Sequence, residues 1–241
     1  MYLSEIFEQL TYGELSQVGI GGGMDVGQIN EANFKSVVAN VNLGLMALYK
    51  RFPIKQDSLF VDVKEGKTDY ELDMKYALSN IDSTEPVKFI NDLVKPFTND
   101  IIKIERVYNF AGIELAMNDT NNLDAIKLLN MTTMKLSPTM LNELSGTSIE
   151  VVYRAKHKLI VVGDNVFNPE TTQIELPYVY LEPLLYFIGS RYHNSIGMSN
   201  EFHAGNNYAT KYEQACRLIE AHSLSIDQGS DTSQFCSKGW V

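Results

Sequence analysis

Cysteine is scarce in this sequence, and long hydrophobic runs are absent. The 241 residues include only Cys216, in an apolar periodic stretch, and Cys236, in a polar tail. Nothing pairs the two into a disulfide framework, so we expect a reducing compartment. No run approaches the ~18 apolar residues of a membrane span. The opening MYLSEIFEQL has acidic residues where a signal peptide carries Lys or Arg. We therefore expect a protein that is made in the cytoplasm and has no membrane partner.

Positive charge is also in short supply. The sequence has 20 basic and 30 acidic residues, giving a net charge of −10. The basic residues are scattered, and their densest group, at residues 154–158, lies in a segment with the pattern of a strand. A surface that binds the phosphate backbone tightly normally has a basic excess. We therefore expect no strong nucleic-acid binding, although an acidic wall would let a duplex slide past.

Motifs for metal and nucleotide binding are missing as well. The histidines show none of the close pairing of zinc ligands, such as HExxH or CxxC. The glycine-rich residues 19–23 follow a predicted helix rather than a strand, and no GK[ST] occurs. We interpret them as a flexible linker. The sequence therefore predicts no metal and no cofactor.

No catalytic arrangement stands out either. There is no GxSxG motif, and residues 146–148 open a predicted strand instead of a strand-to-helix elbow. Asp62 and Glu71 would face each other across a predicted hairpin, but solvated charges at a sheet edge explain them as well. No nucleophile, base or ligand group has workable spacing. We therefore expect no catalytic residue and no enzyme.

The N-terminal region has the periodicity of helices. Apolar residues recur at three- and four-residue steps over residues 30–52. Pro53 ends this predicted helix because proline cannot donate the next backbone hydrogen bond. Residues 3–17 predict shorter helical turns, in which Thr11 and Glu14 have the spacing of a capping box that restarts a helix.

From residue 58 the apolar period shortens towards two, which favours strands. Residues 58–71 predict a hairpin that turns at Glu65 and Gly66. The further predicted elements are a short helix at 86–93, a hairpin at 101–115, a strand at 127–136 and a strand-rich run at 148–162. The middle of the chain is therefore predicted to be a small β-rich domain.

Helical periodicity returns at about residue 178. A break follows at 193–197, and Ser199 is placed to cap a second helix that ends near Ala221. These elements predict an α+β fold: a helical bundle built from N- and C-terminal segments, with an inserted β-rich domain and an extended C-terminal arm. The predicted parts are residues 1–57, 58–172, 173–224 and 225–241.

The arm at residues 225–241 is rich in Ser, Asp, Gln and Gly and is too polar to fold alone. It nevertheless carries Phe235 and Trp240, the only tryptophan. A disordered terminus is the plain interpretation. Aromatic residues on an arm with no local core are, however, typical anchors for another subunit. We therefore predict that Phe235, Trp240 and Val241 form a protein interface.

The order of these features resembles that of the head-to-tail adaptor (connector) proteins of tailed bacteriophages. The resemblance rests on LTYGELSQ, the helix NVNLGLMALYKRF, IIKIERVYNFAGIEL followed by MND, the strand VVYRAKH, and IELPYVYLEPLLYFIGSRYH followed by a helix containing YEQACRLIEAHSL. These pieces span most of the chain in order. The glycine run and the long span between residues 73 and 100 depart from the family pattern.

The resemblance implies a structural virion protein in the neck, between head and tail. Such proteins form a ring, usually a dodecamer, that continues the DNA channel under the portal protein and provides the docking face for a tail or nozzle protein. The helical part typically forms the ring, and the C-terminal arm commonly docks on the portal. Carried onto this sequence, Phe235, Trp240 and Val241 would bind the portal or a neighbouring subunit. DNA would pass through without specific binding during genome ejection.

Two other functions stay open on the sequence. One is a different virion ring protein, such as a tail-tube or nozzle component. The other is a small-molecule binding protein or enzyme with an unfamiliar site.

Overall fold

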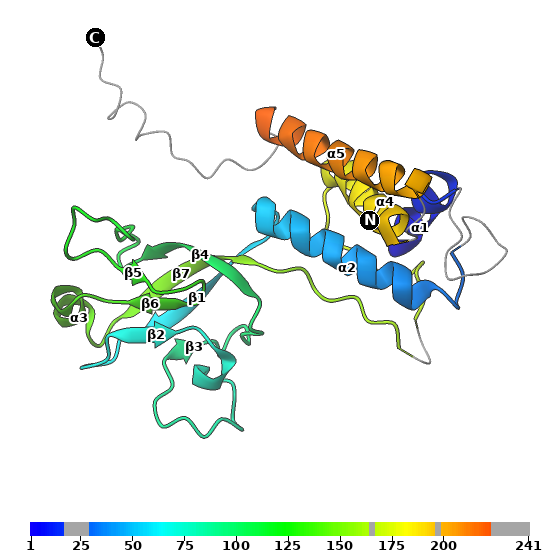
Figure 1. Ribbon diagram of the computed structural model, residues 1–241. Helices are drawn as coiled ribbons and strands as arrows, with labels where there is room; N and C mark the ends of the chain where they lie inside the picture. Colours follow the sequence, from blue (N-terminus) through cyan, green and yellow to red (C-terminus); the bar gives the residue numbers. More distant parts are fainter. Residues whose placement is uncertain (17–28, 164–166, 196–198, 223–241) are drawn as a thin grey trace, which may run out of the picture. The chain divides into compact units, whose positions relative to one another are not determined.

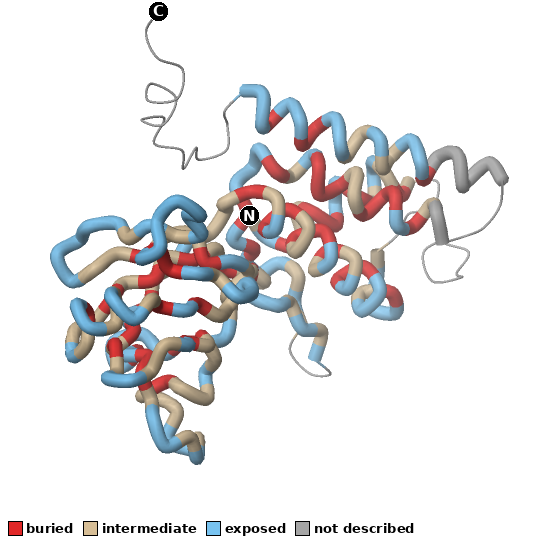
Figure 2. The backbone as a smooth tube through the Cα atoms, turned by 60° about the vertical axis from the view of Figure 1, so that its left-hand side comes forward, coloured by how far each residue is buried: buried red, intermediate tan, exposed pale blue. Residues whose placement is uncertain are grey.

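The computed structural model describes residues 1–16, 29–163, 167–195 and 199–222, with the side chains of 194–204 left out. It contains both α-helices and two antiparallel sheets (Figure 1), which confirms the predicted α+β class. The chain divides into two compact units. A helical unit comprises Met1–Ile54 and Lys158–Val241, and a β-rich unit comprises Lys55–His157. Figure 2 shows buried stretches inside both units and exposed positions along the loops.

The helical unit follows the predicted periodicity closely. The structure confirms the long helix expected at 30–52, and it confirms helix on both sides of the break expected at 193–197. The elements are α1 (Leu3–Tyr12), α2 (Phe34–Arg51), the 3-10 helix η3 (Tyr178–Tyr180), α4 (Leu181–Ser195) and α5 (Ser199–Ala221).

Helix α4 packs against α1, α2 and α5. Its buried residues cover more than one face, as expected of a helix with neighbours on several sides. Two glycines permit close approach to α4. A Cβ added to Gly44 of α2 would lie 2.6 Å from Cδ1 of Leu184, and one added to Gly189 would lie 3.1 Å from Cβ of Glu14.

The capping box predicted at Thr11 and Glu14 is wrong. Thr11 lies inside α1, whereas an N-cap residue stands just outside its helix. Residues 13–16 form a turn instead, in which the Leu15 amide donates to the Leu10 carbonyl at 2.9 Å. This turn buries Leu15 completely.

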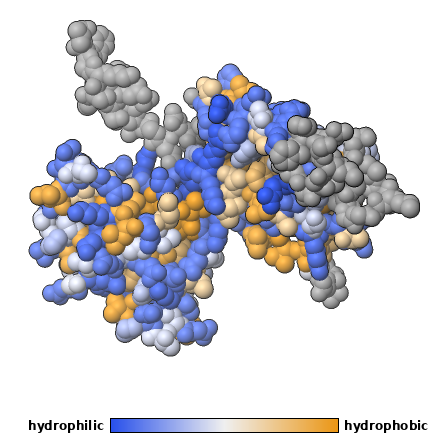
Figure 3. All heavy atoms as spheres, viewed as in Figure 1, coloured by the Kyte–Doolittle hydropathy of each residue, from blue (hydrophilic) through white to orange (hydrophobic). Residues whose placement is uncertain are grey.

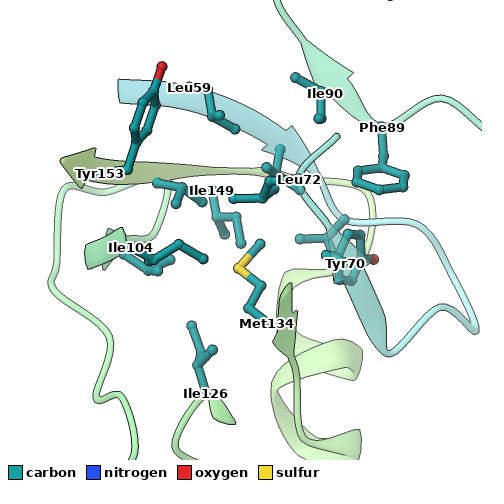
Figure 4. Packing of buried hydrophobic residues seen from close by; sticks show 14 of the residues in the cluster. Leu59, Tyr70, Leu72, Phe89, Ile90, Ile104, Ile126, Met134, Ile149 and Tyr153 are labelled. Carbon is teal, nitrogen blue, oxygen red and sulfur yellow. The ribbon is translucent and has the colours of Figure 1, made fainter. Parts of the chain in front are cut away.

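The β-rich unit contains two sheets around one core. A four-stranded sheet has the order β3-β1-β7-β4, and a three-stranded sheet has the order β2-β6-β5. Figure 4 shows residues of both sheets, among them Ile149 and Met134, pointing into a shared apolar cluster. The elements are β1 (Gln56–Asp62), β2 (Asp69–Glu71), the 3-10 helix η2 (Met74–Tyr76), β3 (Ile90–Asn91), β4 (Ile101–Tyr108), β5 (Lys127–Leu128), β6 (Thr133–Lys135), α3 (Pro138–Leu144) and β7 (Ser148–Ala155).

The hairpin predicted at 58–71 has the right turn but the wrong pairing. Gly66 adopts a φ of 73°, and the Lys67 amide donates to the Lys64 carbonyl at 3.2 Å, so the chain does turn there. However, β1 pairs with β3 on one edge and with β7 on the other. Both edges of β1 are therefore occupied, and β2 pairs with β6 in the second sheet.

The other predicted β elements have mixed outcomes. The turn of the 101–115 hairpin is confirmed, with an antiparallel bridge between Tyr108 and Glu114. The strand expected at 127–136 is a short hairpin of β5 and β6, and the run expected at 148–162 ends as a strand at Ala155. The helix predicted at 86–93 is wrong. The Phe89 carbonyl and amide are bonded to Asp62 and Tyr76, which draws this segment into the sheet as β3.

Candidate interaction surfaces

The residues predicted as protein anchors, Phe235, Trp240 and Val241, lie outside the described residues. So do the glycine-rich residues 19–23 and Cys236. We therefore looked for a functional site among the described residues of the helical unit and of the β-rich unit.

The described histidines lie apart and in different surroundings. His157 is buried in the β-rich unit, and His222 is exposed at the end of α5. His193 stacks on the Tyr208 ring with centroids 5.0 Å apart, and its Nε2 lies 3.1 Å from the Glu14 carbonyl oxygen. Within the described residues, no three His, Cys, Asp or Glu side chains gather in a way that could hold a metal ion.

The two carboxylates considered as a pair in the sequence are not brought together. Asp62 on β1 accepts a hydrogen bond from the Ser148 hydroxyl at 2.7 Å. Glu71 on β2, in the other sheet, forms an ion pair with Lys75 at 2.7 Å. Each carboxylate thus has its own partner and supports local structure.

A small hollow beside Tyr153 in the β-rich unit is lined by several titratable side chains. Its volume is about 150 Å³. The Tyr153 hydroxyl donates to Asp100 at 3.0 Å, and Lys95 pairs with Asp57. Burial, followed by the charge of Asp100, raises the pKa of Tyr153 far above its usual value. The tyrosine therefore stays a hydrogen-bond donor, and the two pairs fasten residues 95–100 to the sheet.

The helical unit has a larger groove, of about 380 Å³. It is lined by residues 158–161 and by 172, 173 and 175. Leu159 and Val161 are 64% and 69% exposed, so apolar side chains flank an open groove. Sequence analysis missed this feature because it assigned residues 158–162 to a strand of the β-rich domain. Residues 159–162 are indeed a run of apolar residues, but the structure places them in the helical unit.

Loops of the β-rich unit also expose large apolar side chains. Phe110 and Ile113, in the turn after β4, are 71% and 62% exposed, and Leu123 is 84% exposed. In Figure 3, hydrophobic residues at the surface of this unit lie among hydrophilic ones. Part of this signal was present in the sequence, because Phe110 lies in the predicted turn of the 101–115 hairpin, where no core is available to bury it.

Comparison with known proteins leaves the chain without an assigned family. No family model matches it. No curated protein matches it either. Within the described residues, none of the helices has an apolar stretch long enough to cross a membrane.

Proposed function

We propose that this chain is a head-to-tail adaptor of a tailed bacteriophage, a structural protein that forms a ring between portal and tail. The observation that carries the proposal is the division of the chain. Met1–Ile54 and Lys158–Val241 make one unit, and Lys55–His157 make the other. A helical unit formed from both ends of the chain, with a β-rich unit between them in the sequence, supports this proposal.

The helical unit is proposed to build the ring. Side chains from distant parts of the sequence join its helices, which makes the unit suitable as a ring subunit. Arg51 at the end of α2 bonds Glu213 and Glu220 of α5, both at close ion-pair distances of 2.9 and 2.8 Å. Tyr49 donates its hydroxyl to the Glu175 carbonyl.

The β-rich unit is proposed to provide the docking face for the tail or nozzle protein. The loops of this unit expose Phe110, Ile113 and Leu123, whereas its core residues are buried. Exposed apolar side chains held on a rigid core are typical of protein–protein contacts. Their exposure favours a protein partner for these loops.

The acidic net charge of −10 supports a channel that guides DNA without holding it. Acidic walls repel phosphates, so a duplex would slide through the ring instead of binding it. The arm, with Phe235, Trp240 and Val241, is proposed to dock on the portal or on a neighbouring copy.

The test is direct mixing with the portal oligomer of the same phage. The chain alone should sediment mainly as a monomer, because copies of charge −10 repel one another. With portal, it should co-sediment as a ring of many copies per portal. A chain that never associates with portal overturns the proposal, and one that binds only the tail tube favours the tail-tube or nozzle component instead.

A further inference from the structure

Residues 158–161 form one wall of the groove in the helical unit. The backbone of this wall is hydrogen-bonded by a single side chain, that of Asn42. Asn42 of α2 donates through Nδ2 to the Ile160 carbonyl at 2.9 Å, and its Oδ1 accepts from the Ile160 amide at 3.1 Å. Asn42 thus imitates the two hydrogen bonds of a neighbouring strand. On either side, the amides of Leu159 and Val161 have no hydrogen-bond partner among the described residues.

Residues 172, 173 and 175 form the second wall, and Gln173 belongs to a short antiparallel bridge with Tyr2. Leu3 donates its amide to the Thr172 carbonyl, and Ile174 donates its amide to the Met1 carbonyl, both at 2.9 Å. This pattern makes Tyr2 and Gln173 a pair that is not hydrogen-bonded to each other. The amide and carbonyl of Gln173 therefore point away from Tyr2, and neither has a partner within the described part of the chain.

We infer that this groove binds an extended segment by backbone hydrogen bonding, and that the segment is the C-terminal arm of a second copy of this chain. Unpaired backbone groups beside exposed apolar side chains are what an added strand requires. Leu159 and Val161 supply the apolar contact, and Phe235 is the side chain of the arm suited to pack on them. This inference rests on the proposed function, since a ring needs contacts between copies.

Chain length allows the arm to extend beyond its own subunit to a second copy. The arm follows α5, whose Glu220 is bonded to Arg51, and Tyr49 on the same turn of α2 reaches Glu175 at the groove. The end of α5 is therefore on the order of 20 Å from the groove. Phe235 lies 14 positions after Ala221, a maximal reach of ~45–50 Å. The arm is therefore long enough to place Phe235 on a neighbouring copy, as the contacts of the proposed ring require.

Exchange of arms in this way gives a head-to-tail contact. The arm and the groove are different surfaces of one chain, so each copy can offer its arm to the next. Contacts of this type close into rings when the rotation between copies permits it. The groove would thus supply the link between neighbours in the proposed ring.

The experiment uses the natural Cys236 of the arm as a reporter. One full-length chain carries Gln173→Cys together with Cys236→Ser, and the other is the unaltered chain. They are mixed at high protein concentration and raised salt, which screens repulsion between acidic copies, and then mildly oxidised. A covalent dimer that joins position 173 of one copy to Cys236 of the other, identified by peptide mapping, should form in the mixture. The buried Cys216 is shielded from reaction.

Two further chains complete the design. Val161→Cys on the other wall repeats the measurement should Gln173→Cys fail to fold, and Ala39→Cys on the exposed side of α2 is the matched control. A chain carrying Gln173→Cys and the natural Cys236 tests binding within one copy. An internal link without a dimer, or no link above the Ala39→Cys control, overturns the inference. Since no portal is present, such a failure is separate from a failure of the chain to bind portal.

Discussion

Lys67 places its ammonium group among three aromatic rings of the β-rich unit. Its Nζ lies 4.9 Å from the ring centroid of Phe89, 5.5 Å from that of Tyr76 and 5.8 Å from that of Tyr70. Tyr76 and Phe89 stack with centroids 4.7 Å apart. The cation therefore covers one end of the aromatic cluster and holds the turn after β1 against it.

Replacing Lys67 with Gln should lower the free energy of unfolding by ~0.5–2 kcal/mol, because the cation–π attraction is lost. Lys67→Arg should retain most of that stability, since the guanidinium keeps the charge over the rings. Lys103 is exposed on β4, and Lys103→Gln serves as the control. Urea denaturation measures all three, and an equal loss from Lys67→Arg and Lys67→Gln would contradict a role for the charge.

Arg51 stabilises the helical unit in a way that depends on pH. Its hydrogen bond lowers the pKa of Glu220 from the ordinary value of 4.5. A carboxyl with a lowered pKa binds fewer protons in the folded state. The contribution of Glu220 to the free energy of unfolding is therefore complete above pH 4.5. It is lost as the pH falls through the pKa that Glu220 has in the folded protein.

Glu220→Gln should consequently cost stability near neutral pH, by ~0.2–1 kcal/mol for an exposed ion pair. The cost should shrink as the pH falls below the lowered pKa of Glu220, where the wild-type carboxylate is protonated too. Glu8→Gln, which removes the same charge from an exposed position on α1, is the matched control. Thermal denaturation at neutral and acidic pH compares the variants, and a pH-independent cost of Glu220→Gln would refute the mechanism.

At the scale of elements, the contact between α2 and α4 depends on Gly44. A Cβ at this position would meet Cδ1 of Leu184 at 2.6 Å and Cδ1 of Phe187 at 3.1 Å. Gly44→Val should therefore force the helices apart and destabilise the protein by ~1–3 kcal/mol. This loss would occur although valine is the better helix former.

Ala39→Val is the matched control for Gly44→Val, since Ala39 is exposed on the same helix. It should cost no more than the difference in helix propensity, ~0.7 kcal/mol or less. Chemical denaturation of both variants decides the matter. Equal costs at the two positions would mean that the α2–α4 contact does not depend on the glycine.

The long helix α2 could be predicted from sequence because a single apolar stripe sets it. The stripe from Val37 to Leu48 is long enough to fix both the type and the face of α2. The partners of β1 could not be predicted, since pairing depends on segments far along the chain. Asp62 donates its amide to Phe89 and sits opposite Ser148, contacts that no local pattern encodes.

The groove was hidden from sequence analysis for a related reason. Its walls are short stretches that carry no periodic signal, and each is placed by a distant residue, Asn42 for one and Leu3 for the other. The predicted arm anchors differ, because two aromatic residues in a polar tail are visible without any structure. Phe235 and Trp240 remain predictions, since they lie outside the described residues.

At the scale of the whole molecule, the arm should be separable from the fold. Deleting residues 225–241 should leave the thermal stability of the monomer unchanged, because the described helices end at Ala221. The same deletion should yield DNA-filled heads that cannot accept a tail. Normal occupancy of portals by the truncated chain would show that the arm has no part in assembly.

Trp240 reports on docking of the arm because it is the only tryptophan of the chain. Its fluorescence emission should shift to the blue when the chain assembles, as the indole leaves water. Trp240→Ala should weaken attachment by ~2 kcal/mol or more, as expected for a central anchor. Emission that does not change on assembly would mean that the residue stays in water and is no anchor.

The central claim, a ring between portal and tail, is tested most directly by cryo-electron microscopy of the intact particle. The account predicts a closed ring of copies beneath the portal, into which the helical and β-rich units fit as separate bodies, with the DNA channel running through its centre. Particles whose portal contacts the tail with no density for this chain between them would contradict it.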